Sequence, residues 1–153
     1  MINNWWVTRP KRKLTSVPED LAVVATAALN REWEGDRHLH LQVEEGLEAS
    51  GLKRTGDRRD QGGGGGRTYV AWLKSLGLLF TQSATNKLML TLAGEELLDG
   101  GNPTLILTSQ IFKYQFPSPF SISPNVCVHG RFHIRPFRFL FRLLLDYNVK
   151  YLT

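Results

Sequence analysis

The chain has 153 residues, of which 42% are hydrophobic, and a formal net charge of +5 at pH 7. This length allows one domain or two very small ones, and the apolar content excludes a globally disordered chain. The basic balance favours an anionic partner, either nucleic acid or a membrane surface. The single cysteine excludes an internal disulfide and fits a reducing compartment. We find no secretory signal at the N-terminus and no apolar run long enough to span a bilayer, so we expect a cytoplasmic protein that does not use a membrane.

Two helices are predicted in the first third of the chain. Ser16 and Glu19 have the spacing of a capping box, and Pro18 suits the first turn of a helix. The apolar residues that follow recur at helical spacing and form one face: Leu21, Val24, Ala25 and Ala28. A second helix is predicted over about 38–50, with Gly51 just after its end. Its expected inward residues are Leu39, Val43 and Leu47.

A run of glycines from Gly62 to Gly66 precedes the third predicted helix. A nucleotide-binding P-loop would need a glycine where the chain has Gln61, a lysine where it has Arg67, and a buried strand in front. The charged segment 52–60 does not fit such a strand. We therefore interpret 55–66 as a glycine-rich loop and the run as a mobile tether, because each glycine loses much backbone entropy when it is ordered.

The third helix is predicted to begin near Thr68 and to end at Gly77. Its expected inward residues are Tyr69, Trp72, Leu73 and Leu76. The residues expected to face outward are Thr68, Ala71, Lys74 and Ser75. A two-stranded hairpin follows, because LLFT and KLMLT flank SATN, and a short helix then ends at Gly100.

Three helices followed by a hairpin are the order of elements in a winged helix, whose third helix normally enters a major groove of DNA. The loop before the third helix is much longer than the three or four residues of a helix-turn-helix turn, which indicates an insertion there. We assign residues 1–101 to this DNA-binding unit. The whole chain is predicted to be mainly α with a small β-hairpin, of the α+β class, with winged-helix-like architecture.

Residues 102–153 are predicted to form a helical extension. One helix follows Pro103 and is stopped by Pro117 and Pro119. The last helix begins at Pro136, and the stretch from Phe137 to Leu145 is apolar on nearly every side, so we expect it to pack on a downstream domain or a partner. Three arginines near one edge of this helix are expected to pair with carboxylates or with that missing domain rather than with DNA: Arg135, Arg138 and Arg142.

Short motifs occur along the chain in a characteristic order. They are WWVTRPKRK at 5–13, LNREWEG at 29–35, TLAG at 91–94, KYQFP at 113–117 and FHIRP at 132–136. The third helix contributes further residues to this pattern. They are Arg67 at its N-terminal end, Val70 and Ala71, and Lys74 shortly before Gly77. In this order the motifs resemble the N-terminal region of the AlwI-like type IIS restriction endonucleases and their nicking relatives. The likeness spans nearly the whole chain.

The resemblance implies a module of a restriction-modification system that reads a short asymmetric site in double-stranded DNA. In that family a separate downstream nuclease domain cuts at a distance. Such a nuclease needs clustered carboxylates and a lysine to hold Mg²⁺ and activate water. The sequence has no Glu-x-Lys, and Asp146 is the only acidic residue after position 103. We therefore expect no cleavage of DNA by this chain alone, and no catalytic residue or cofactor within it. Mg²⁺ is expected only for the absent nuclease domain.

The candidate DNA contacts fall into four groups. The first lies on the third helix and consists of Arg67, Thr68, Lys74 and Ser75. A helix N-terminus beside an arginine attracts phosphate, and arginine can also bind a guanine edge. The second group is a basic loop with Lys53, Arg54, Arg58 and Arg59; the third is an N-terminal arm with Arg9, Lys11, Arg12 and Lys13; the fourth is Lys113. Each group also has an interpretation without DNA. The first would be a solvated helix face, the second a solvated loop, the third an irregular terminal segment, and Lys113 would belong to the end structure of its helix.

Other functions stay open beside DNA recognition by such a module. One is a winged-helix transcription regulator that dimerises through the last helix, and another is a protein-docking subunit that uses Phe137 to Leu145. A dimeric regulator prefers palindromic sites, whereas a recognition module can bind an asymmetric site as a monomer.

The spacing of Cys127, His129 and His133 suits zinc, but a structural zinc site needs four ligands and no fourth is close, so no metal site is predicted.

Overall fold

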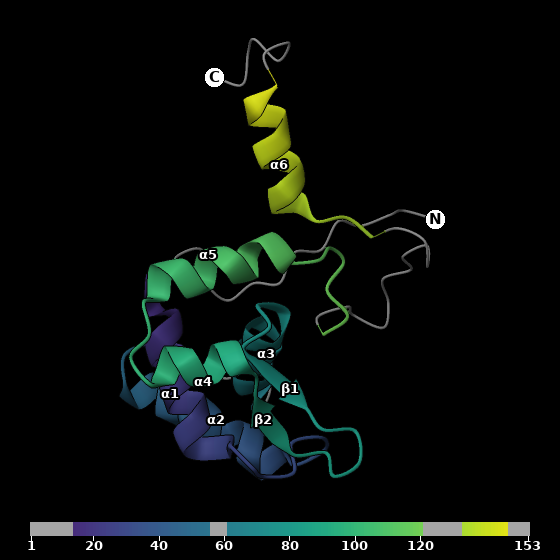
Figure 1. The fold of residues 1–153 in the computed structure, drawn as a ribbon. Helices are drawn as coiled ribbons and strands as arrows, with labels where there is room; N and C mark the ends of the chain where they lie inside the picture. The colour runs from purple at the N-terminus through teal and green to yellow at the C-terminus, as the bar shows by residue number, and fades with distance from the viewer. Residues whose placement is uncertain (1–13, 56–60, 121–132, 147–153) are drawn as a thin grey trace.

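The computed structural model describes residues 14–55, 61–120 and 133–146. As predicted, the protein is mainly helical with a two-stranded antiparallel hairpin, of the α+β class (Figure 1). After a short 3-10 turn at Leu14–Ser16, its elements are α1 (Val17–Ala28), α2 (Arg37–Ala49), α3 (Gly64–Ser75), β1 (Leu79–Thr81), β2 (Leu88–Leu90), α4 (Leu92–Leu98), α5 (Pro103–Lys113) and α6 (Pro136–Leu145).

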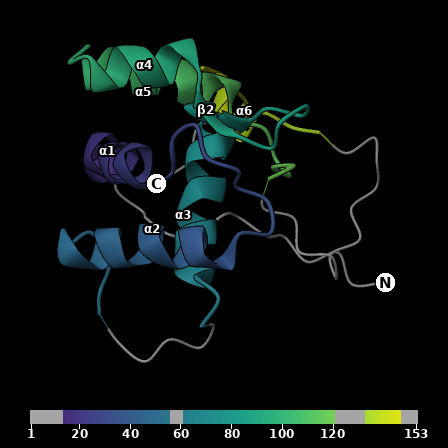
Figure 2. The same cartoon turned by 90° about the horizontal axis from the view of Figure 1, so that it is seen from below.

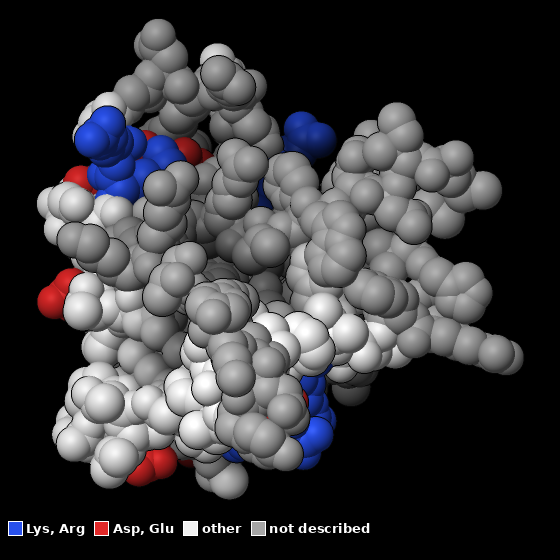
Figure 3. Space-filling model, turned by 90° about the horizontal axis from the view of Figure 1, so that it is seen from above, with Lys and Arg blue, Asp and Glu red and all other residues white. Residues whose placement is uncertain are grey.

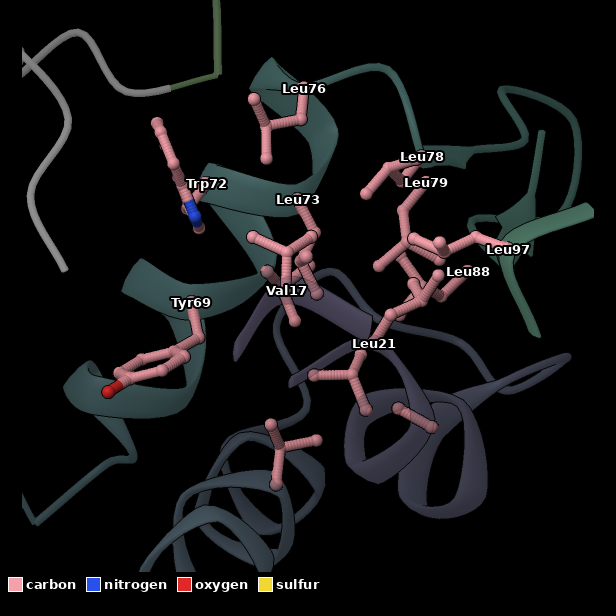
Figure 4. Close-up of a cluster of buried hydrophobic side chains, with 14 of the residues drawn as sticks. Val17, Leu21, Tyr69, Trp72, Leu73, Leu76, Leu78, Leu79, Leu88 and Leu97 are labelled. Carbon is pink, nitrogen blue, oxygen red and sulfur yellow. The ribbon is translucent and has the colours of Figure 1, made fainter. Parts of the chain in front are cut away.

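The core lies where α1, α2 and α3 pack on one another, and Figure 2 shows α3 running across α2. The buried side chains recur at helical spacing, which confirms the inward faces predicted for these three helices except at Ala25, which is half-buried. Figure 4 shows how α1, α3 and the hairpin contribute to this cluster, in which Leu21, Leu73 and Leu88 are completely buried. Burial of each such leucine stabilises the fold by about 1.5–3 kcal/mol relative to its exposure to water.

The hairpin is joined by part of the connection between α1 and α2, where Glu32 forms an antiparallel bridge with Lys87. Within the hairpin, Leu79 lies opposite Leu90. The backbone of Asn30 donates to the Leu88 carbonyl at 2.9 Å, and Leu88 donates in return to the Arg31 carbonyl at 3.0 Å. A further bond of 2.8 Å joins Trp33 N–H to the Asn86 carbonyl. These bonds fix the hairpin to the three-helix core, and three helices followed by a hairpin is the order of elements that the sequence predicts.

Both ends of α2 carry the signals that a helix boundary requires. The Asp36 side chain accepts a hydrogen bond of 2.9 Å from the Leu39 N–H, which satisfies one of the donors left free in the first turn. At the other end, Gly51 has a φ of +68°, the left-handed conformation that glycine adopts without steric cost, as predicted for the residue after this helix.

The substitution Asp36→Asn is expected to remove an acid-sensitive part of the stability. The hydrogen bond from the Leu39 N–H lowers the pKa of Asp36 from its usual 3.8. The carboxylate therefore stabilises the fold above the unfolded-state pKa, and this contribution is lost as the pH falls through the lower folded-state pKa. Urea unfolding measured from neutral pH down to about pH 2 should show a steeper loss in the wild type than in the variant, because Asn has no charge to titrate. Parallel curves would contradict the prediction.

The predicted capping box at the start of α1 does not form. Ser16 is the N-cap residue, but its backbone is in the helical region (φ −93°, ψ −2°) and its side chain makes no capping bond. The Ser16 hydroxyl instead donates to the Asp20 carboxylate at 3.2 Å. The prediction was wrong because a 3-10 turn precedes the helix, so the Ser16 backbone does not adopt the extended conformation that capping needs.

The interpretation of the glycine run as a mobile tether was also wrong. α3 begins at Gly64 and not near Thr68, so the last glycines of the run form its first turn, while Gly63 takes a left-handed conformation (φ +74°) in front of it. A β-carbon on Gly66 would collide with the His40 carbonyl oxygen of α2, and one on Gly65 with the Glu44 carboxylate. The glycines are required because the two helix backbones approach closely at this point.

Of the three C-terminal helices, α4 and α5 pack on the core and α6 does not. α4 is capped by Thr91, whose hydroxyl accepts from the Gly94 N–H at 3.2 Å, and the helix packs on α1, on β2 and on α5. α5 buries Ile106 and Leu107 against the core and ends at Lys113, ahead of the prolines predicted to stop it. α6 begins with Pro136 as predicted and rises from one end of α5, away from the helical core (Figure 1).

Candidate nucleic-acid interface

The exposed part of α3 is a narrow strip that starts in its second turn. Within this helix only Arg67 and Thr68 are exposed, and the strip continues over the half-buried Ala71 and Ser75. The Arg67 guanidinium donates to the Gly62 carbonyl at 2.9 Å, and the Thr68 hydroxyl donates to the Gly64 carbonyl at 2.8 Å. Both side chains therefore lie over the glycine turn, at the N-terminal end of the helix.

The N-terminus of α3 already has an internal anion. One oxygen of Glu44, on α2, accepts from the Gly65 N–H at 3.0 Å, and the other lies 2.9 Å from the Lys53 ammonium. The Glu44 side chain is only 4% exposed. A carboxylate at this position satisfies the positive end of the helix dipole, so a phosphate binding to the same N–H groups would have to compete with Glu44.

Lys53 is held on the protein rather than directed into solvent. Its ammonium lies 2.9 Å from Glu44 and 2.6 Å from Glu48. Burial favours the neutral amine, but the hydrogen bonds to Glu48 and Glu44 outweigh this effect and raise the pKa of Lys53. Two carboxylates therefore offset the charge that was predicted to neutralise DNA phosphate.

The prediction that Lys74 faces outward was wrong. Its side chain is 8% exposed, and its ammonium lies 3.3 Å from Glu34, which also accepts from the Thr81 hydroxyl at 3.4 Å. The segment after α5 packs across this side of α3. The Trp72 and Tyr114 rings have centroids 6.3 Å apart, and the Ser75 and Ser118 hydroxyls are 2.6 Å apart.

This packing brings together candidates that are far apart in the sequence. A groove beside the end of α3 is lined by Lys74 and Ser75 and also by Lys113, Gln115 and Ser118. The Gln115 amide lies 2.9 Å from the His133 ring nitrogen, which ties the same segment to the start of the C-terminal helix. The motif at 113–117 thus meets the third helix, a contact that no spacing in the sequence indicates.

The other predicted contacts are dispersed or lie outside the described residues. Arg54 and Lys113 are exposed. The remaining candidates fall outside the described ranges: Arg58, Arg59, Arg9, Lys11, Arg12 and Lys13, together with Cys127 and His129 of the spacing considered for zinc. On the face drawn in Figure 3, the Lys and Arg side chains of the described residues lie in separate groups, one of them beside acidic side chains. They do not form one continuous basic patch on that face.

The residue of this site that the sequence interpretation missed is Glu44. A signal was present, because Glu44 shares the inward face of α2 with His40 and Leu47 at helical spacing. A charged residue on an inward face is buried only where it has a partner, and here the partners are Lys53 and the backbone of Gly65.

The arrangement defines a mainly helical α+β protein with a hairpin beside its third helix. No family model matches the chain, and comparisons with curated proteins and with solved structures find no match. Among the described residues, no helix has the length and apolar character needed to cross a membrane.

Proposed function

We propose that the chain is a sequence-specific recognition module for double-stranded DNA, of the kind found in type IIS restriction and nicking endonucleases. The observation that carries the proposal is the exposed strip of α3, which begins with Arg67 and Thr68 on a helix followed directly by a hairpin. A winged helix presents its third helix to the major groove, where an arginine fork matches the two acceptors of guanine. The motif resemblance supports the same class and adds that the site is asymmetric.

In this proposal the basic residues have different tasks. Arg67 reads a base, and Thr68 binds a base or a phosphate beside it. The exposed Arg54 and Lys113 bind phosphates, which fixes the register but carries no sequence information. Lys53 and Lys74, which pair with carboxylates, hold the loop and the end of α3 in place and do not contact DNA.

The proposal is tested by selection from a pool of randomised duplex DNA at near-physiological salt. Enrichment of one short asymmetric motif is the expected result and would identify the recognised site. A palindromic motif would instead favour a dimeric regulator. Absence of any enriched motif would overturn sequence-specific recognition. Cleavage is not expected in any of these cases, because the sequence provides no nuclease carboxylate cluster.

The substitution Arg67→Ala is expected to weaken binding to the selected site by about 1–3 kcal/mol, with little change on random DNA, because a bidentate base contact is lost. The matched control is Arg54→Ala, which should weaken binding to all sequences alike and reduce the salt slope by about one. Fluorescence anisotropy with both DNAs at several salt concentrations measures these effects. Equal losses on specific and random DNA for Arg67→Ala would contradict its role in base reading.

A further inference from the structure

Among the α-helices of the described residues, α6 alone has no buried residue. Its apolar side chains are largely exposed, for example 62% for Phe139 and 82% for Leu145. Monomeric soluble proteins rarely expose large contiguous apolar patches of this kind. The helix is attached to the core through aromatic contacts on one side. Phe141 packs on Phe112, with ring centroids 5.1 Å apart, and Phe137 packs on Tyr114 at 5.8 Å.

A groove runs between α5 and α6. Its apolar surface comes from Phe112 of α5 and from Phe141 and Leu145 of α6. Lys113 of α5 and Arg138 and Arg142 of α6 line the same groove, together with Ser109. The two arginines lie one turn apart, so they form a short row along the helix.

The charged side chains that line this groove are all positive. Lys113, Arg138 and Arg142 have no carboxylate partner among the described residues, and no acidic side chain lines the groove. An occupant must therefore supply both apolar side chains for Phe141 and Leu145 and negative charges for the cations. DNA supplies charge without apolar side chains, so this groove differs in chemistry from the proposed base-reading strip.

We propose that the groove between α5 and α6 binds an acidic amphipathic helix of a partner protein. A groove between two helices accepts a third helix, whose apolar residues at i, i+3, i+4 and i+7 would lie on Phe112, Phe141 and Leu145. Asp or Glu residues beside that apolar stripe would face Arg138 and Arg142. A lipid bilayer would also supply apolar contacts and negative charge, and the test below distinguishes it from a partner helix. This inference does not depend on DNA recognition.

The test is a selection from a displayed library of helical peptides of about 18 residues, long enough to run past both helices. The immobilised target is the full chain. The expected result is enrichment of Leu or Phe at i, i+3, i+4 and i+7 with Asp and Glu beside them. In solution, the enriched peptides should bind the double variant Arg138→Glu/Arg142→Glu with an affinity at least about tenfold lower than their affinity for the wild-type chain. They should also bind Leu145→Asp weakly, and this residue is exposed enough to be changed without unfolding the protein.

The matched control is Arg37→Glu/Lys87→Glu, which makes the same change in net charge at two exposed positions outside the groove. This control should bind the enriched peptides as the wild type does. Three results would overturn the proposal: no acidic enrichment, equal affinity for the wild type and the double arginine variant, or an equal loss in the control. Sedimentation of the chain with phosphatidylglycerol vesicles, without peptide enrichment, would overturn it in favour of a membrane surface.

Discussion

Gly66→Ala is expected to destabilise the protein by about 3 kcal/mol, at the upper end of the cost of overpacking a core. The new β-carbon would collide with the His40 carbonyl oxygen and would lie 3.2 Å from the Glu44 backbone nitrogen. Both are backbone atoms of α2, so neither can move aside by a side-chain rotation. Alanine normally stabilises a helix by about 1 kcal/mol relative to glycine, so the sign of the result separates helix propensity from close packing.

Urea unfolding followed by tryptophan fluorescence measures this effect, with Thr68→Ala as the control. Thr68 is exposed on the same helix, two residues away, and its substitution should change the free energy of unfolding by less than about 0.5 kcal/mol. A stabilised Gly66→Ala would mean that the glycines are a flexible lead-in to the helix after all. In that case α3 would not be held against α2, and its exposed strip would have no fixed direction.

The order of elements and most of the core could be predicted from the sequence because the apolar residues of α1, α2 and α3 recur at helical spacing. Leu39, Val43 and Leu47 were predicted to face inward, and all three are completely buried. The hairpin followed from two short β-prone segments around a polar turn. These features depend on local patterns, and the tertiary structure reinforces them rather than overrides them.

The start of α3 could not be predicted in this way. Glycine has a low helix propensity, so a run of five glycines argues against a helix by about 1 kcal/mol per residue. The structure shows a helix there because Gly65 and Gly66 allow the close approach to α2, and because Glu44 accepts a hydrogen bond from the first turn. Both reasons involve residues of α2 that lie more than twenty positions away, which no local pattern contains.

The surroundings of Lys74 were hidden for the same reason. Helical spacing placed Lys74 outward relative to the three-helix core. In the structure its ammonium pairs with Glu34, and the segment carrying Ser118 contacts the neighbouring Ser75. Periodicity describes one buried face of a helix, and α3 is buried on a second face by a segment about forty residues further along the chain.

Glu44→Ala is expected to cost about 3 kcal/mol, because it breaks a buried ion pair and leaves the Gly65 N–H without its acceptor. The Lys53 ammonium would keep Glu48 and the Arg54 carbonyl, whereas the Gly65 N–H would lose its acceptor. Glu44→Gln should cost less, since the amide oxygen can still accept from Gly65 while the charge is lost. The free energy of unfolding is measured by urea titration at neutral pH.

A double-mutant cycle with Lys53→Met separates the two tasks of Glu44. A coupling energy above about 1 kcal/mol would assign the main effect to the ion pair, and a smaller one would assign it to the helix N-terminus. The coupling should persist in high salt, because a buried pair is screened much less than a surface pair. If neither Glu44 variant is destabilised, the carboxylate does not hold this helix end, and the α3 N-terminus is open to a DNA phosphate. If both are destabilised, DNA phosphates must bind elsewhere, and recognition depends on the strip that begins at Arg67.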